Sequence, residues 1–187
     1  MNSTVLHLLI AALLSFTPLR ADEQKPPAEL FGKGPLEFVV DIPDSFGMPV
    51  ETDTAYLTTD AGKAPYRELT WKHEKDTLVI RWTVLPEAAW QGKTPKEMFA
   101  NAKALLTRQE NVQLITDRDY KVGESPAHSF VFSVTGAKPG FQRIDYVLTK
   151  PEMNVVIYAS PTREAIEGKT CEGIFTSIST TPRAPKK

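Results

Sequence analysis

The side chains best suited to chemistry in this chain are a histidine flanked by two serines. His128 lies between Ser125 and Ser129, the residue types of a general base and a nucleophile. A strand is predicted here, and neighbours on a strand point to opposite faces, so Ser129 cannot easily reach His128. His128 shares its predicted face with Phe130 and Phe132. We therefore expect a packed histidine rather than a catalytic base, and a protein that is not an enzyme.

Cys171 is the only cysteine, so the chain has no intramolecular disulfide. It belongs to an i, i+3, i+4, i+7 pattern with Ile174, Phe175 and Ile178, which is typical of one face of a helix. We predict that Cys171 is a small buried side chain in the core and not a reactive thiol.

Metal-binding patterns are weak. Asp117 and Asp119 could join Glu124 around a hard cation, but the stretch has no Gly-containing calcium loop. His73 and His128 lack the spacing of a zinc pair. The glycines of residues 136–140 lie between two predicted strands and indicate a hairpin turn, not a phosphate loop. We expect neither a metal nor a cofactor.

Aromatic residues give a softer indication of function, because Trp and Tyr are favoured at protein interfaces. Trp90 lies in the polar stretch 86–92 and Phe46 in the loop after the first strand, so these two are the predicted partner-binding residues. Tyr66 and Trp71 could line the same groove. For Trp71, burial in the core is the stronger expectation.

The elements that position these residues can be read from their periodicity. Alternating apolar residues predict strands over 36–42, 54–59, 67–73, 77–85, 112–116, 128–134, 144–148 and 154–159. Thr94, Pro95 and Glu97 predict a capping box that begins a helix. Its apolar stripe comprises Met98, Phe99, Ala102, Leu105 and Leu106. Ser160 and Pro161 begin a predicted closing helix that ends near Ile178.

Hairpin-length connections between these strands favour an antiparallel sheet over a doubly wound parallel one. The predicted fold class is therefore α+β, with an antiparallel β-sheet packed between or against helices as an α/β/α sandwich.

The two ends of the chain differ from the middle. Residues 1–21 have an apolar run and a helix breaker, typical of a secretory signal peptide cleaved between Ala21 and Asp22. An uncleaved N-terminal anchor is the alternative. Residues 22–35 are predicted to be a flexible linker, 36–179 the domain, and 180–187 a disordered basic tail.

Composition excludes one class of partner. Without residues 1–21 the chain has 21 Lys and Arg against 23 Asp and Glu, a net charge of −2. Nucleic-acid binding needs a basic face, so none is expected. We also expect no stable membrane span after removal of the signal, because the apolar run is shorter than a spanning helix.

The order of elements resembles the PsbP/DcrB-like domain of the Mog–PsbP-like fold superfamily. The similarity lies in the opening strand and Ile-Pro-Asp turn (39–44), the Thr-Pro-capped helix and the Val-Gly-Glu-Ser-Pro-Ala strand entry (122–127). It continues in the Tyr-Val-Leu-Thr strand (146–149) and the closing helix. The resemblance implies an antiparallel sheet between helical layers and an exported accessory or binding domain without enzymatic activity.

These observations lead to one functional expectation and its alternatives. The expected protein is an exported, non-enzymatic accessory domain, periplasmic or extracellular, that binds a protein partner of the cell envelope. The first alternative is a periplasmic protein that binds a small ligand or an ion, and the second is an uncharacterised enzyme.

Overall fold

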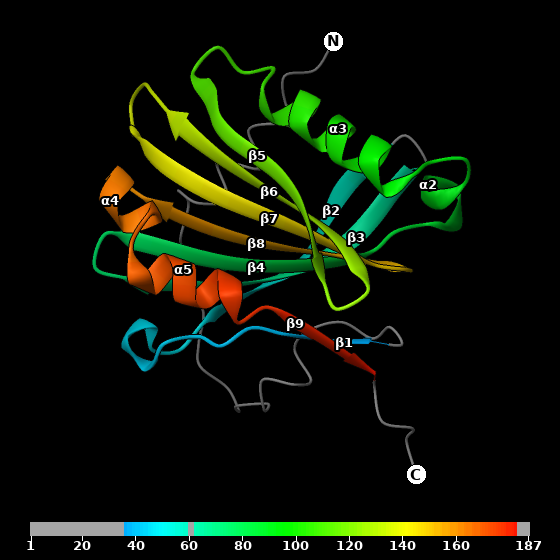
Figure 1. Ribbon diagram of the computed structural model, residues 1–187, viewed down its shortest axis with the longest axis horizontal. Coiled ribbons are helices and arrows are strands. Elements are labelled where there is room, and N and C mark those ends of the chain that lie inside the picture. The colour runs from blue at the N-terminus through cyan, green and yellow to red at the C-terminus, as the bar shows by residue number, and fades with distance from the viewer. Residues whose placement is uncertain (1–35, 60–61, 183–187) are drawn as a thin grey trace.

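The computed structural model describes residues 36–59 and 62–182, and the core of this part is a seven-stranded antiparallel sheet (Figure 1). Its strand order is β2-β3-β4-β8-β7-β6-β5. The strands are β2 (Val50–Thr59), β3 (Gly62–His73), β4 (Asp76–Val84), β5 (Val112–Val122), β6 (Ser125–Val134), β7 (Gly140–Thr149) and β8 (Glu152–Ser160). A separate two-stranded sheet pairs β1 (Leu36–Val39) with β9 (Ser179–Pro182).

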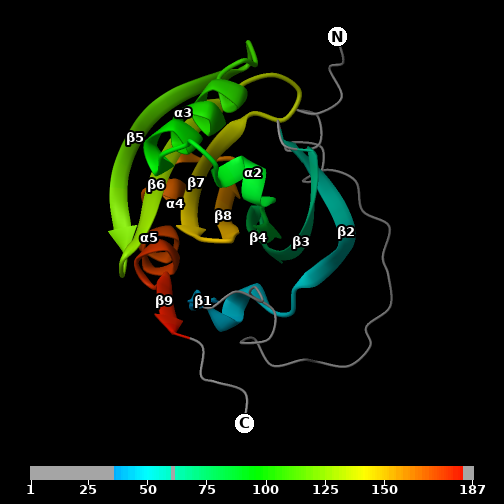
Figure 2. The same ribbon diagram turned by 90° about the vertical axis from the view of Figure 1, so that its right-hand side faces the viewer.

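The helices are few and short compared with the strands. They are the 3-10 turn η2 (Asp44–Phe46), α2 (Glu87–Trp90), α3 (Pro95–Leu106), α4 (Arg163–Ile166) and α5 (Lys169–Thr176). Figure 2 shows α2 and α3 on one side of the curved sheet and α5 with the β1–β9 pair on the other. The antiparallel sheet with helices expected from the sequence is therefore present.

Strand alternation divides the core between the two faces of the sheet. On β4, Leu78, Ile80 and Trp82 face one cluster, whereas Val79 faces the other. The α5 face buries Cys171 together with Ile174, Phe175 and Phe38 of β1. On the α3 face, two residues of α3, Phe99 and Leu106, pack on strands β6, β7 and β8. The predicted burial of Cys171 is confirmed, with none of its surface exposed.

The capping box predicted for α3 is confirmed in detail. The Thr94 hydroxyl accepts a hydrogen bond from the Glu97 amide, and the Glu97 carboxylate accepts one from the Thr94 amide at 2.7 Å. These bonds satisfy helix N–H groups that have no intrahelical partner. The prediction is wrong for one residue of the apolar stripe. Leu105 is 46% exposed, because it lies beyond the edge of the buried face that Phe99 and Leu106 mark.

The closing helix is shorter and more broken than the sequence indicates. Thr162, not Ser160, caps α4, and Gly168 caps a separate helix, α5. A Cβ on Gly168 would lie 2.9 Å from the carbonyl oxygen of Glu164, so the two helices meet too closely for a larger residue. The chain then pairs as β9 through Pro182, so the first residues of the predicted tail belong to the fold.

None of the helices in the described part of the chain has the length and hydrophobicity needed to cross a bilayer. The predicted signal peptide, its cleavage site at Ala21 and Asp22, the linker 22–35 and residues 183–187 lie outside the described residues.

Candidate partner-binding site

The predicted partner-binding tryptophan lies at one end of the sheet, where β4 leads into the single turn of α2. We call Val84, Glu87, Trp90 and Lys150 the α2 corner. Lys150 comes from the turn between β7 and β8, and the next residue, Pro151, accepts a hydrogen bond from the Leu85 amide at 3.0 Å. This bond ties the β7–β8 turn to the end of β4, and so brings Lys150 beside α2.

Trp90 is only partly exposed. Its indole packs against both the α3 cluster and a small cluster of Ala64, Leu85 and Ala89. The indole Nε1 is buried and has no hydrogen-bond partner in the part of the chain that the structure describes. Trp90 was expected in an exposed polar loop, whereas the structure places it in a one-turn helix between two apolar clusters. Its role in partner binding stays a prediction.

The outer side of the α2 corner combines apolar and charged groups. Val84, the last residue of β4, is 48% exposed. The Lys150 ammonium lies 6.0 Å from the centre of the Trp90 ring and 3.3 Å from the Glu87 carboxylate. Both charged side chains are largely exposed, so this ion pair contributes little to stability. Strand alternation places the Val84 side chain on the α5 face with Trp82, whereas Trp90 packs on the α3 face, so the two border the corner from opposite faces of the sheet. A partly exposed aromatic ring beside a charged pair is typical of an interface rim.

Phe46, the other predicted partner-binding residue, lies in the core and not at a surface. It is 3% exposed, and its ring centre lies 5.3 Å from that of His73 and 6.2 Å from that of Tyr158. The one-turn helix η2 directs the side chain inward onto the α5 face of the sheet. The expectation of an exposed loop is corrected here, because Phe46 continues the even-numbered apolar series of residues 36–42.

His128 is held by its neighbours, as expected for a packed histidine. Its Nδ1 lies 2.6 Å from Asp119 Oδ1, and its ring stacks against Phe130 at 4.3 Å and Phe99 at 5.3 Å between centres. The other ring nitrogen, Nε2, is buried and has no hydrogen-bond partner among the described residues. Ser129 points to the opposite face, where its hydroxyl donates to Asp145 at 2.5 Å. The structure therefore does not bring Ser129 and His128 together.

The carboxylates considered for a cation each lie close to a different cationic or histidine side chain. Asp117 forms an ion pair with Lys103, Asp119 contacts His128, and Glu124 lies 3.9 Å from Lys121. The hydrogen bond from Lys103 lowers the pKa of Asp117. Within residues 36–59 and 62–182, no three His, Cys, Asp or Glu side chains are grouped closely enough to hold a metal ion.

A buried polar network under α5 was not predicted from the sequence. Asp145 has no exposed surface and accepts hydrogen bonds from Tyr120 at 2.7 Å, from Ser129, and from Arg143 at 3.2 Å. Arg143 also donates to Glu172 on α5 at 2.7 Å. Burial and the Asp145 charge raise the pKa of Tyr120. The network joins β5, β6, β7 and α5, so its role is structural.

A second buried pair, on the α3 face, was also missed. The Arg81 guanidinium donates to Glu68 through Nε at 2.8 Å and lies over the Tyr66 ring at 4.5 Å. In register, Arg81 continues a row across the sheet through Val155 and Tyr146 to His128. The available sequence signal is the odd-numbered Arg81 between the apolar residues of β4, which indicates a polar group on a buried face.

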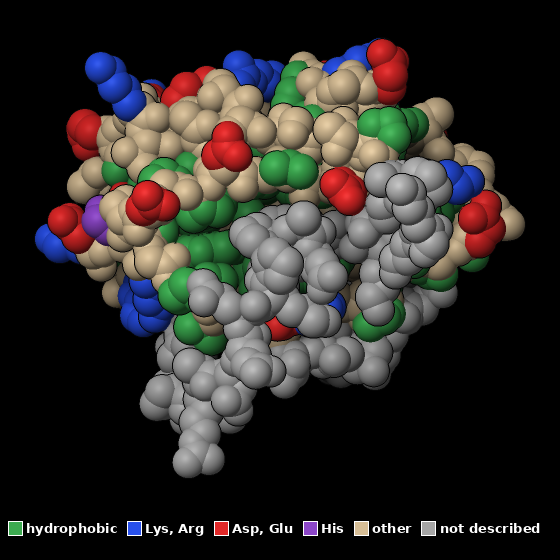
Figure 3. Space-filling model, turned by 90° about the horizontal axis from the view of Figure 1, so that it is seen from below, with side chains coloured by type: hydrophobic (Ala, Val, Ile, Leu, Met, Phe, Trp, Pro, Cys, Tyr) green, Lys and Arg blue, Asp and Glu red, His purple; other side chains and the backbone are tan. Residues whose placement is uncertain are grey.

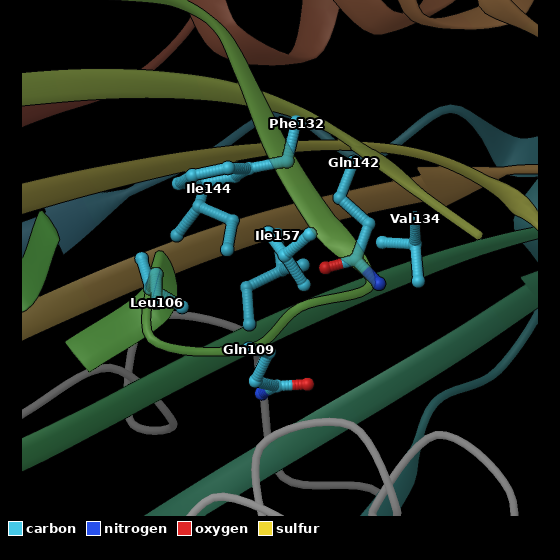
Figure 4. A pocket seen from close by; sticks show the side chains of 8 residues that line it. Leu106, Gln109, Phe132, Val134, Gln142, Ile144 and Ile157 are labelled. Atoms are coloured by element: carbon cyan, nitrogen blue, oxygen red, sulfur yellow. The ribbon is translucent and has the colours of Figure 1, made fainter. Parts of the chain in front are cut away.

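A small apolar pocket lies between the end of α3 and the sheet. It is lined by Leu106, Gln109, Val112, Phe132, Val134, Gln142, Ile144 and Ile157, most of which are apolar (Figure 4). Its volume of about 10 Å³ is room for a single water, far below the several hundred Å³ of a typical ligand site. This pocket therefore does not favour the small-ligand alternative.

Among the described residues, Figure 3 shows Lys and Arg side chains interspersed with Asp and Glu around the periphery of one face. This mixture agrees with the near-neutral composition.

No protein-family model and no curated protein matches the chain. Among solved structures, the chain is similar to cyanobacterial PsbP from Synechocystis sp. PCC 6803, at 10% identity and a TM-score of 0.47, covering 81% of this chain and 95% of that one. It is also similar to a putative regulator of unknown function from Pseudomonas aeruginosa, at 7% identity and a TM-score of 0.46, covering 71% and 99%.

A third similar structure is the T6SS immunity protein TplEi from Pseudomonas aeruginosa, at 16% identity and a TM-score of 0.43. The match covers 77% of this chain and 53% of the immunity protein, so the chain spans about half of that protein's length. The PsbP resemblance drawn from the sequence thus has a counterpart among solved structures. The proposals below rest on the geometry of the chain itself.

Proposed function

We propose that this chain is an exported accessory domain that binds a protein partner through the α2 corner and has no catalytic activity. The observation that carries the proposal is the composition of this corner: the partly exposed Trp90 ring lies beside the charged pair Lys150 and Glu87, and the half-exposed Val84 ends the strand that leads into α2. Aromatic and apolar side chains with a charged rim are what protein interfaces use.

The state of the reactive side chains supports the absence of catalysis. The His128 ring lies against Asp119, Phe99 and Phe130. The Cys171 thiol is buried, and burial raises its pKa to about 12, which keeps it protonated and unreactive at neutral pH. A buried, protonated thiol and a histidine whose Nδ1 contacts Asp119 and whose Nε2 is buried are poorly placed to act on a substrate.

The test compares two matched surface substitutions. Val84 in the α2 corner and Leu105 on α3 are almost equally exposed, at 48% and 46%. Val84→Asp and Leu105→Asp therefore add the same charge at positions of comparable exposure, and the melting temperature of each variant is measured to check that it folds. The tagged protein is crosslinked in its native cells and its partners are identified by mass spectrometry.

We expect a partner that is recovered with the wild type and Leu105→Asp and lost with Val84→Asp. Recovery of the same partner with both variants, or its loss with both, would contradict the proposed surface. Trp90→Ala is a poorer probe, because the indole packs against two core clusters and its removal also lowers stability.

A further inference from the structure

The closed position of α2 contains a polar group that the fold does not satisfy. The Trp90 Nε1–H group is buried and has no acceptor among residues 36–59 and 62–182, although an indole N–H normally finds one when it is buried. Such a donor destabilises the closed arrangement, and it regains a hydrogen bond to water as soon as the ring moves outward.

The backbone of α2 is held only weakly. The helix is a single turn, Glu87–Trp90, and no side chain caps its N-terminus. The hydrogen bonds at its ends include those from the Ala89 amide to Pro86 at 2.8 Å and from the Gln91 amide to Glu87 at 3.2 Å. A single uncapped turn has little stability of its own and depends on the packing beneath it.

The segment ends at a glycine with a left-handed backbone conformation. Gly92 has φ +67°, with nothing within 4 Å of where a Cβ would lie, so the turn is open to solvent. Beneath α2 lie Leu85, Met98 and Met153. Methionine side chains adapt to different partners, which suits a surface that is covered at one time and exposed at another.

We propose that α2 is a latch: residues 86–92 swing outward as one unit about Gly92 and expose the apolar floor of Leu85, Met98 and Met153. Opening lets the indole N–H bond to water but loses the packing of Trp90. Because these two effects oppose each other, thermal motion populates both the closed and the open state. The latch is a property of the protein alone and does not require the proposed partner.

The test is hydrogen exchange followed by NMR on the purified full-length chain without any partner. If α2 opens as a unit, the Trp90 indole proton and the Ala89 and Gln91 amides exchange at similar rates. We expect these rates to be about 100-fold faster than those of the central strands β4 and β8, which exchange only on global unfolding. Exchange of the indole proton as slow as that of β4 and β8 would overturn the latch.

A matched pair of glycine variants tests the hinge. Gly92→Ala strains the closed turn, because an L-residue tolerates φ +67° poorly, and should speed exchange of the three α2 protons about five-fold. Gly47→Ala introduces the same strain at φ +64° in the turn before β2, also with nothing within 4 Å. It should leave α2 exchange unchanged. Equal effects of the two variants would overturn the hinge at Gly92.

These outcomes are separate from those of the crosslinking experiment. Rapid indole exchange without any partner lost on Val84→Asp would support the latch and contradict the partner surface. Loss of a partner on Val84→Asp, together with a fully protected indole proton, would support the partner surface and contradict the latch.

Discussion

Asp145 shows at the scale of a single residue how this fold uses a buried charge. Its carboxylate has no exposed surface and is surrounded by Arg143, Ser129 and Tyr120. Burial opposes the charge of Arg143, but Asp145 and Glu172 outweigh it and raise the pKa of the guanidinium. The network holds α5 on the sheet, and its energy depends on every member being present.

We expect Asp145→Asn to destabilise the protein by about 3 kcal/mol, because it removes one partner of a buried ion pair and leaves Arg143 under-compensated. Urea unfolding measures the loss. Asp119→Asn is the matched control, since Asp119 is 69% exposed and its pairing with His128 is worth about 1 kcal/mol or less. Equal losses for the two variants would contradict the structural role of Asp145.

Phe46 provides a second test at the residue scale. Because it is buried against His73 and Tyr158, Phe46→Ala should cost about 3–5 kcal/mol and lower the melting temperature clearly. A change within about 0.5 kcal/mol, as expected for an exposed loop residue, would restore the original interpretation of Phe46 as a surface contact.

Buried acidic groups predict a loss of stability at high pH. Burial raises the pKa of Cys171 and of Tyr146 to about 12, above their ordinary values of about 8.5 and 10. A raised pKa contributes stability that is present below the unfolded pKa and is lost as pH rises through the folded pKa.

The urea midpoint should therefore fall between about pH 9 and 12, and Cys171→Ala should make the early part of that fall shallower. A midpoint that stays constant up to about pH 10.5, or a Cys171→Ala profile identical to the wild type, would contradict this assignment.

At the scale of the element, α3 shows which local signals act independently of the rest of the fold. Its start is fixed by Thr94, Pro95 and Glu97, whose side chains and ring conformation act within one turn. The backbone and side-chain hydrogen bonds from Thr94 lower the pKa of Glu97. The stability that these hydrogen bonds contribute is therefore present above the unfolded pKa of Glu97 and is lost as the pH falls through its folded pKa.

Thr94→Ala should lower stability by about 1 kcal/mol, because an amide of the first turn loses its acceptor. Hydrogen exchange should increase in the first turn of α3 and much less in its last turn. Thr107→Ala at the other end of the same helix is the control, since its hydroxyl only donates to the Lys103 carbonyl. A larger loss for Thr107→Ala would contradict the capping assignment.

The strands could be predicted where apolar residues alternate, but their lengths could not. β5 continues through the charged residues 117–121 because it is an edge strand, whose exposed side chains carry no periodic signal. α2 was missed because a four-residue helix is shorter than one apolar repeat. The break at Gly168 depends on a close contact between α4 and α5, and such a contact has no local signature.

At the scale of the whole molecule, the order of elements sufficed for the antiparallel class but not for the positions of β1 and β9. These strands are separated by the entire domain in sequence and pair with each other outside the main sheet. The same limit applies to the candidate site. Trp90 was singled out by residue type and its role stays a prediction, whereas Lys150 comes from a different hairpin, and only the fold brings the two together.

Export is a prediction about the whole chain. The protein recovered from the cell envelope or medium should begin at Asp22, because the sequence around Ala21 is typical of a cleaved signal. N-terminal sequencing measures this directly. A chain that still begins at Met1 would favour the uncleaved anchor over the cleaved signal.

The most direct test of the partner-binding account is site-specific photo-crosslinking in living cells, with a benzophenone side chain placed once at Val84 and once at Leu105. The two positions have nearly the same exposure, but Val84 lies in the α2 corner and Leu105 lies on α3. The account predicts one discrete covalent adduct from Val84 and none from Leu105. Adducts of the same mass from both positions, or from Leu105 alone, would contradict binding at the α2 corner.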